Sequence, residues 1–409
     1  MKKYLLLICP SVLLTVSAGA NVDELYLRSL KKSKQVEIYN LTEKGSLAIL
    51  DSYTSSLYPS LDLVNSNTYD KDYTGSGKNE LDSEFYFSLS QKIFQGGAEF
   101  ALNDYRKLLP KQAKAQTKKS LSDYYGKFTS LYFQVSSAYE ETEKIEALLQ
   151  NLRKRVNIVK KRTRIGRDRK ADLYALESQL HKLDSDLLTS KAQLENALTE
   201  FRNYSGLEKL DGLKNRIDPL KLTLPSTVDL DKVPALTSLK YDYESSLIET
   251  RIEESKYYPQ VELGASYNLD KNNYDERDWA VSVNVKLNLF DFGVKKSRVQ
   301  NKKILSRINN AQIEYTRRNS DNHWQKYLKN FDLKKNELMT LRRSLDRSKD
   351  SYQEQLKDLD KGLVTQIDVI RSLDDVIQLE KLVIRSALDV KSLYYQANAF
   401  LGNIPKDKR

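Results

Sequence analysis

The sequence predicts an α+β fold in which two β-strands and a long helical hairpin occur twice through tandem duplication. Three observations support this prediction: landmarks at one constant spacing, segments in which apolar and polar residues alternate, and long helical stripes of apolar residues. The chain has 409 residues, of which 40% are hydrophobic and 30% are charged, enough for one large domain or two ordinary ones.

The duplication is visible as a spacing of 196 residues between similar landmarks (362 − 166 and 368 − 172). The aligned pairs are Phe94 with Phe290, Gly97 with Gly293, Gly166 with Gly362, and Asp172 with Asp368. Landmarks that lie more than 70 residues apart in the chain keep this spacing (166 − 94 = 72). We therefore predict a first repeat at 21–205, a linker at 206–234 that holds three of the eight prolines, and a second repeat at 235–409.

Each repeat contains two segments that alternate like β-strands. In the segment from Trp279 to Phe290, residues 279, 281, 283, 285, 287 and 289 are apolar, and most of the residues between them are polar. Phe85, Phe87, Leu89 and Ile93 alternate in the same way, and strands near 57–69 and 257–269 would pair with these two segments. A period of two over about ten residues is typical of a membrane barrel strand, although a soluble hairpin shows it too.

Apolar residues spaced by three and four predict long helices after each pair of strands. The two longest would cover 98–165 and 295–361, and each would be about 100 Å long at 1.5 Å per residue. Shorter return helices are expected at 171–205 and 366–401, and leading helices at 22–52 and 235–256. Two apolar stripes on 366–401 suggest a helix that packs on two neighbours, as in a closed tube of helices.

The N-terminus has the features of a secretory signal peptide. Two lysines precede an apolar run, and Ala18-Gly19-Ala20 predicts cleavage after Ala20, so the signal peptide would cover residues 1–20 and take the only cysteine, Cys9, with it. The net charge of +11 would become +9 (11 − 2) after the loss of two lysines. A basic surface suggests acidic neighbours, such as anionic lipid headgroups, cell-wall polymers or an acidic partner protein.

No other segment approaches the ~20 apolar residues of a membrane-spanning helix, so a secreted chain of this kind could enter a membrane only as a β-barrel. Four strands cannot close a barrel, because closure needs about eight. The chain would therefore have to oligomerise, and a trimer would supply 12 strands.

These features resemble the family of TolC-like outer membrane efflux and secretion channels, the outer membrane factors. The resemblance covers nearly all of the chain after residue 20. The residues that carry it are Tyr58-Pro59 and Tyr258-Pro259, "LFDFG" at 289–293 with its counterpart "IFQGG" at 93–97, and the Gly-x5-Asp-Val sequence from Gly362 to Val369.

The resemblance implies a homotrimer with a 12-stranded barrel in the outer membrane and a long α-helical coiled-coil tube in the periplasm. Such proteins are exit ducts of tripartite efflux pumps or type I secretion systems. Their partners are a periplasmic adaptor (membrane fusion protein) and an inner-membrane transporter. The family implies no enzyme activity and no cofactor. The sequence leaves open an alternative, a secreted coiled-coil structural or interaction protein without channel activity.

The resemblance also implies adaptor-docking tips where the long helices turn back. The residues concerned are Arg164, Ile165, Gly166, Arg167, Gly362 and Leu363. The family usually has an apolar residue after the first glycine, whereas this chain has Arg167 within the basic stretch "KKRTRIGRDRK" at 160–170. Nucleic-acid binding is disfavoured because this stretch has no aromatic residue and the chain is expected to be exported. The remaining interpretations are a solvated helix turn and a surface for an adaptor that presents carboxylates.

A pore gate at Asp368 and Arg371 is the second implied site. The family carries acidic rings on the return helix of the second repeat, and three copies of Asp368 around a threefold axis would attract cations. The second acidic position is Arg371 here, so an interaction between Asp368 and Arg371 at i and i+3 is expected instead. The alternative is that Asp368 is an acid favoured by the dipole at a helix N-terminus.

Other chemistry is sparse. His181 and His323 have no second ligand at metal spacing, so we expect both on helix surfaces and no metal site. Lys92 and Lys286 fall on the polar side of their strands and would face the barrel interior, where they would mildly favour anions.

Overall fold

A computed structural model of the chain describes residues 22–55, 58–70, 80–209, 213, 217–269 and 279–406. The predicted signal peptide at 1–20 lies outside the described residues. Residues 71–79 and 270–278, which connect the two strands of each pair, lie outside them as well.

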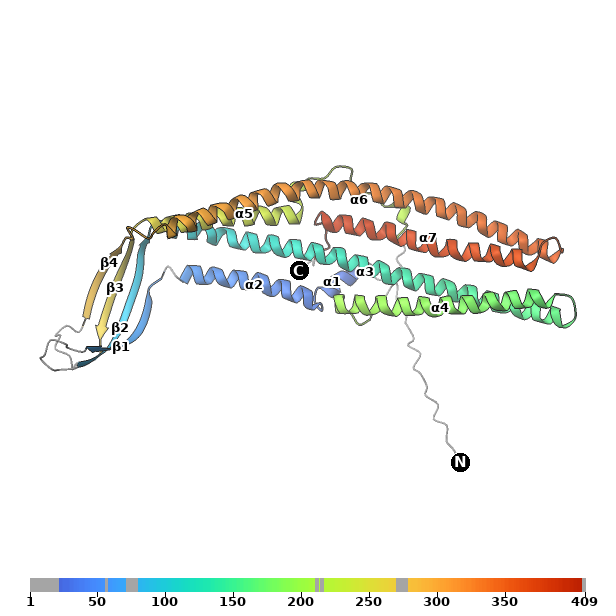
Figure 1. The fold of residues 1–409 in the computed structure, drawn as a ribbon, viewed down its shortest axis with the longest axis horizontal. Helices are drawn as coiled ribbons and strands as arrows, with labels where there is room; N and C mark the ends of the chain where they lie inside the picture. Colours follow the sequence, from blue (N-terminus) through green and yellow to red (C-terminus); the bar gives the residue numbers. More distant parts are fainter. Residues whose placement is uncertain are drawn as a thin grey trace, which may run out of the picture. The chain divides into compact units, whose positions relative to one another are not determined.

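The described elements follow the same order twice (Figure 1). The first half contains α1 (Val22–Ser29), α2 (Lys34–Ser55), β1 (Ser60–Asp70), β2 (Glu80–Gln95), α3 (Ala98–Arg164) and α4 (Lys170–Ser205). The second half contains α5 (Pro234–Glu254), β3 (Gln260–Asn268), β4 (Trp279–Lys286), α6 (Val294–Asp360) and α7 (Gln366–Phe400). Helices α3 and α6 both have 67 residues and begin 196 positions apart (294 − 98). The predicted duplication is thus confirmed in the pattern of helices and strands.

Short 3-10 helices fill parts of the connections, at Pro219–Lys221, Leu230–Lys232 and Ser255–Tyr257. The first two lie in the predicted linker at 206–234. The predicted repeat and linker boundaries themselves stay predictions. Within the described ranges, no helix is both long and apolar enough to cross a lipid bilayer.

The chain divides into two compact units, which we describe separately. The strand unit comprises residues 39–119 and 230–320, and the tip unit comprises the remainder, 1–38, 120–229 and 321–409. Helices α3 and α6 contribute their first parts to the strand unit and their remaining parts to the tip unit.

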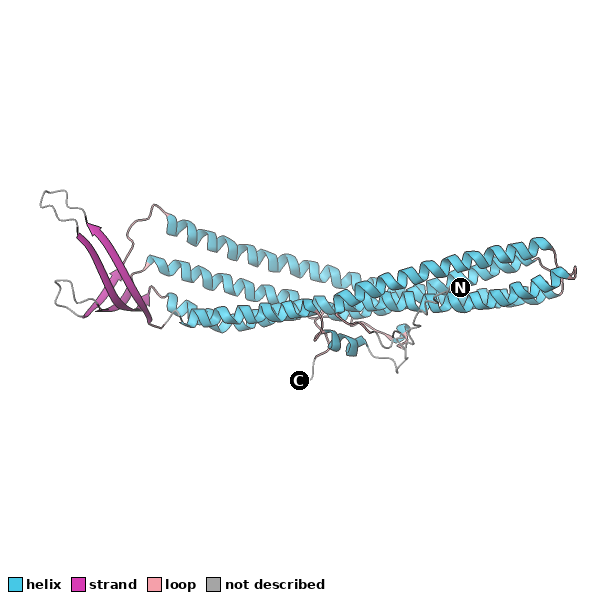
Figure 2. Ribbon diagram, turned by 90° about the horizontal axis from the view of Figure 1, so that it is seen from below, coloured by secondary structure: helices cyan, strands magenta, loops and turns pink. Residues whose placement is uncertain are grey.

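The strand unit contains one antiparallel sheet in the order β1-β2-β3-β4, labelled in Figure 1 and drawn in magenta in Figure 2. The predicted pairs β1–β2 and β3–β4 are confirmed, and β2 pairs with β3 to join the two repeats. Strand β4 ends at Lys286 rather than near Phe290, because β3 begins at Gln260, which pairs with Lys286. The ladder therefore ends before residues 287–290.

The register places apolar residues of all four strands on one face, because residues directly opposite each other share a face. This apolar face contains Leu61, Leu63, Tyr69, Phe85, Phe87, Leu89, Val261, Leu263, Ala265, Tyr267, Trp279, Val281, Val283 and Val285. Val283 is 64% exposed and Leu61 is 67% exposed. The opposite face is mostly polar, as in the pair Lys92–Glu262, and it includes Lys286. Both lysines lie on the polar face of the sheet.

The helices of the strand unit pack through both apolar contacts and ion pairs. A small apolar cluster joins α3 to α5 through Ala101, Leu108 and Ile248. Ion pairs join α5 to α6: Lys302 Nζ lies 2.7 Å from Glu249 Oε2, and Lys303 Nζ lies 2.8 Å from Glu254 Oε1. Exposed pairs of this kind contribute little stability, so they mainly set which faces of the two helices meet.

The tip unit has a larger core. Its residues are Ile145, Leu149, Leu152, Val156 and Val159 of α3, Leu176 and Leu183 of α4, and Leu373 and Ile377 of α7. The apolar residues of α3 that follow one another at spacings of three and four are therefore buried in this core. A second group of buried aromatic rings includes Tyr26, Tyr124, Phe128 and Phe201 and ties α1 to α3 and α4.

Gly96 fixes the junction between β2 and α3 against the end of α5. Its φ is +67°, and a Cβ atom there would lie 2.2 Å from the carbonyl oxygen of Ser255, closer than real Cβ contacts. The neighbouring Gly97 has a φ of +90° but open space around its Cβ position. Both positions favour glycine through their backbone, but only Gly96 is also required by a close approach.

The substitution Gly96→Ala should therefore destabilise the protein more than Gly97→Ala. Both variants incur the cost of a positive φ, about 1 kcal/mol. Gly96→Ala must also displace the Ser255 carbonyl, which adds roughly 1–3 kcal/mol. The midpoint of thermal unfolding in detergent measures the difference. Equal midpoints for the two variants would contradict the close approach at Gly96.

Candidate functional site at the turns of the helical hairpins

Each helical hairpin closes through the same backbone turn. After α3, the N–H of Arg167 donates to the carbonyl of Arg162 at 2.9 Å, and the N–H of Gly166 donates to Thr163 at 3.1 Å. After α6, Leu363 donates to Asp358 at 2.9 Å and Gly362 to Leu359 at 3.0 Å.

The pattern of these bonds is that of the Schellman motif, with glycine in the left-handed conformation at the C′ position. Gly166 has a φ of +75° and Gly362 a φ of +76°. The glycines that the duplication aligns are therefore the residues that end the two long helices.

The side chains at the two turns are exposed. Ile165 is 67% exposed and Leu363 is 70% exposed, and Arg164 and Arg167 are exposed as well. The residues predicted for adaptor docking are thus accessible in this chain.

Charge distinguishes the two turns. Residues 160–170 hold seven basic residues and one acidic residue, a net charge of +6. The aligned residues 356–366 hold two of each, a net charge of zero. In the second turn, Lys357 pairs with Glu354 and Lys361 pairs with Asp358. The duplication has kept the backbone of the turn but not its charge.

Arg162 links the two turns within the tip unit. Its Nε lies 3.2 Å from Asp168 Oδ2 in its own turn, and its Nη1 lies 3.8 Å from Asp360 Oδ1 at the end of α6. The two turns lie at the same end of the tip unit (Figures 1 and 2). The predicted docking residues of both hairpins are therefore brought to one end of this unit.

Asp368 has a clear local role at the start of α7. The hydroxyl of Thr365 accepts from the Asp368 N–H, and Asp368 Oδ2 accepts from the Thr365 N–H at 3.0 Å and from its hydroxyl at 2.5 Å. This capping box satisfies two N–H groups that the helix cannot pair itself. In the first repeat, Arg169 lies at the position aligned with Thr365, just before α4. Its side chain does not cap the helix, and its Nε instead pairs with Asp172 at 3.2 Å.

The hydrogen bonds from Thr365 are the largest cause that lowers the pKa of Asp368, and the charge of Arg371 lowers it further. A carboxyl group with a lowered pKa contributes stability that is complete above its unfolded pKa, about 3.9, and is lost as the pH falls through the folded pKa. Asp368 is therefore a carboxylate at every pH near neutrality.

Asp368 and Arg371 both line a hollow between α6 and α7 of about 670 Å³. Four serines line it as well: Ser344, Ser348, Ser351 and Ser372. The two predicted gate residues thus lie on one side of the α6–α7 hairpin, among small polar side chains.

Charged contacts join α7 to α4. Asp374 accepts from Gln179 at 2.5 Å and from Lys182 at 3.0 Å, and Lys381 donates to Asp186 at 2.9 Å. Sequence reasoning did not identify these contacts, because residues almost 200 positions apart give no local signal. It also missed Thr365, although the Thr-x-x-Asp pattern at 365–368 is a readable capping signal.

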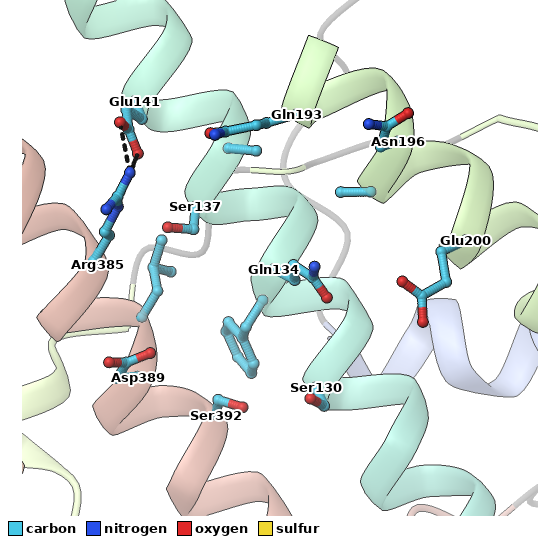
Figure 3. A pocket seen from close by; sticks show the side chains of 14 residues that line it. Ser130, Gln134, Ser137, Glu141, Gln193, Asn196, Glu200, Arg385, Asp389 and Ser392 are labelled. Carbon is cyan, nitrogen blue, oxygen red and sulfur yellow. Dashed lines mark hydrogen bonds and ion pairs between the residues drawn. The ribbon is translucent and has the colours of Figure 1, made fainter. Parts of the chain in front are cut away.

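Further along, α7 is held to α3 and α6. The buried Glu380 pairs with Lys144 at 3.2 Å and with Lys349 at 3.0 Å. Arg385 donates to both carboxylate oxygens of the buried Glu141, at 2.9 to 3.1 Å. Figure 3 shows this ion pair at the edge of a polar hollow of about 570 Å³ between α3, α4 and α7. Ion pairs thus join α7 to α3, α4 and α6.

The two histidines lie on exposed helix surfaces, His181 on α4 and His323 on α6, as predicted. Across the described part of the chain, no group of three or more His, Cys, Asp or Glu residues is placed to hold a metal ion.

Comparison with known proteins identifies the second half of the chain directly. Residues 230–400 match the family described as outer membrane efflux protein. Its members are transport channels rather than enzymes. No curated protein matches the chain.

Solved structures of the outer membrane efflux protein family share the fold over almost the whole chain. CusC is 13% identical with a TM-score of 0.81, and the match covers 95% of this chain and 93% of CusC. VceC of Vibrio cholerae is 14% identical with a TM-score of 0.78, covering 94% and 97%. The CmeC channel of Campylobacter jejuni is 15% identical with a TM-score of 0.78, covering 95% and 87%. The resemblance to TolC-like channels is confirmed.

Proposed function

We propose that this chain is the exit duct of a tripartite efflux pump, in which three copies form one channel. The observation that carries the proposal is the sheet, which has an exposed apolar face and a polar opposite face. In water, an exposed apolar face that extends over four strands would be unfavourable. In a bilayer, the same face would contact lipid, and the polar face would line an aqueous channel.

The two edge strands support a closed oligomer. β1 and β4 are the ends of the sheet order, so one side of each presents backbone N–H and C=O groups to a further strand. Hydrocarbon offers no hydrogen bonds to such groups. Pairing β4 of one copy with β1 of the next would satisfy them, and three copies would give a 12-stranded barrel, above the closure minimum of about eight.

The partners in this proposal are a periplasmic adaptor and an inner-membrane transporter. The description of the family as efflux proteins favours small-molecule efflux over type I protein secretion as the role of the pump. Lys92 and Lys286 would then face the channel through the barrel.

The first test is the mass and conductance of the purified protein without residues 1–20. We expect a trimer in detergent by light scattering corrected for bound detergent, and stepwise conductance after reconstitution into planar bilayers. A water-soluble monomer or dimer without conductance would sink the proposal. It would favour the alternative, a secreted coiled-coil interaction protein.

We further propose that Arg164, Ile165, Gly166, Arg167, Gly362 and Leu363 dock the adaptor, and that the adaptor presents carboxylates to the first turn. The net charge of +6 at residues 160–170 supports this proposal. Complementary charge at an interface raises the association rate and selects partners.

Reversing two of these charges with Arg164→Glu and Arg167→Glu should weaken binding of the cognate adaptor by about tenfold at low salt, because two attractions become repulsions. The control is Lys326→Glu with Lys329→Glu, the same charge change at exposed positions of α6 in the tip unit. Surface plasmon resonance at two salt concentrations measures both. If both double variants bind the adaptor equally, the acidic-partner proposal is wrong.

We also propose that Asp368 and Arg371 lie at the pore gate, where three copies of Asp368 would attract cations. The lowered pKa of Asp368 supports a carboxylate that stays charged at neutral pH. Its capping role is separate from this, because capping acts within one chain.

Asp368→Asn should weaken block of the channel by Mg²⁺ by about tenfold, because a ring of three charges is lost. Thr365→Ala removes the capping hydroxyl but keeps the charge, so it should leave the block nearly unchanged. In the unmodified protein, the block should persist through the pH range in which an ordinary aspartate takes up a proton, because the hydrogen bonds from Thr365 lower the pKa of Asp368. Equal loss of block in both variants would assign Asp368 to capping alone.

A further inference from the structure

A basic hollow lies in the strand unit where the strands end and the helices begin. Its volume is about 800 Å³, and it is lined by the end of β2, the end of α5 and the first turns of α6. The charged residues that line it are Arg251, Glu254, Lys296 and Lys303, and Tyr257 and Tyr258 lie beside them. A pocket of this size accommodates a small molecule or a lipid headgroup.

The hollow carries an excess of positive charge. Three of its four charged residues are cations, of which Lys303 pairs with Glu254 at 2.8 Å and Arg251 pairs with Asp104 at 3.0 Å. These pairs are substantially exposed, so an incoming anion can share the cations without breaking a buried interaction. Lys296 is exposed at the start of α6.

Exposed aromatic residues border the same junction. Phe290 is 74% exposed and Phe292 is 91% exposed, with their ring centroids 4.6 Å apart. Lys295 ties this segment to the hollow, because its Nζ donates to the carbonyl of Asn288 at 2.8 Å and lies 5.8 Å from the ring centroid of Tyr257. The segment directly continues β4, which contributes to the apolar face of the sheet.

A ligand for this junction therefore needs an anionic head for the hollow and apolar chains for the phenylalanines. Aromatic rings and basic side chains together are typical of the interface between a bilayer and water. We infer that the hollow binds the phosphate of an anionic phospholipid in the membrane leaflet on the helix side of the sheet. Arg251, Lys296 and Lys303 would hold the phosphate, and the acyl chains would run along the exposed aromatic residues.

The test is a titration of the purified, delipidated trimer with dioleoyl-phosphatidylglycerol and with dioleoyl-phosphatidylcholine in mixed micelles, with bound lipid counted by native mass spectrometry. We expect tighter binding of phosphatidylglycerol. Lys296→Gln should weaken it about fivefold, and Arg251→Gln with Lys296→Gln roughly 25-fold, from the usual contribution of each basic residue at an anionic surface.

The control is Lys111→Gln with Lys114→Gln, an equal loss of charge at exposed positions of α3 in the same unit. It should bind phosphatidylglycerol like the unmodified protein. Equal affinity for the two lipids, or equal loss in the hollow variants and the control, would overturn the inference. Displacement of the lipid by millimolar inorganic phosphate would also overturn it, because the hollow would then be a site for free anions.

The inference rests on the proposed membrane position of the sheet, and the two can fail separately. A trimer that conducts but shows no preference for phosphatidylglycerol contradicts the lipid site alone. A protein that neither forms trimers nor conducts contradicts the proposed function first.

Discussion

The hydrogen-bonding groups at the two edges of the four-stranded sheet constrain the rest of the structure. A sheet with one apolar face is stable in lipid only when β1 and β4 find partners, and one chain cannot supply them. The helices must accommodate the same assembly, because α3 follows β2 and α6 follows residues 287–293 after β4. The junction at Gly96, where the backbone of β2 meets the end of α5, therefore connects the requirements of the membrane to those of the helices.

The duplication has preserved backbone geometry and allowed side-chain chemistry to diverge. Both turns are Schellman motifs 196 residues apart, yet their side chains differ. Leu363 aligns with Arg167, and Thr365 aligns with Arg169 as the residue before the return helix. The charged links from α7 to α3 and α4 join the second repeat to the first. The Lys349–Glu380 pair lies within the second repeat and aligns with the Arg153–Asp184 pair of the first.

Most of the fold could be predicted from the sequence, because long helices and alternating strands carry strong local periodicity. The predicted ends of the long helices differ from the observed ends by one residue, and the glycines that set those ends were visible in the alignment of the repeats. Strand β4 was predicted too long, since its end depends on where β3 starts. Asp368 was found by resemblance, and its bonds to Thr365 could have been read from the Thr-x-x-Asp pattern. The contacts of Arg162 with Asp360 and of Asp374 with α4 depend on spatial neighbours that the sequence does not show.

The divergence of the two turns limits the symmetry of any complex built on them. A trimer would carry six turns with nearly equal backbones, three strongly basic and three neutral in net charge. Six identical partner subunits could match the backbone shape of all six turns, but they would meet two chemically different surfaces in alternation. The subunits would occupy one kind of turn at low concentration and the other kind only at higher concentration. The stoichiometry of the complex would then vary with the concentration of the partner.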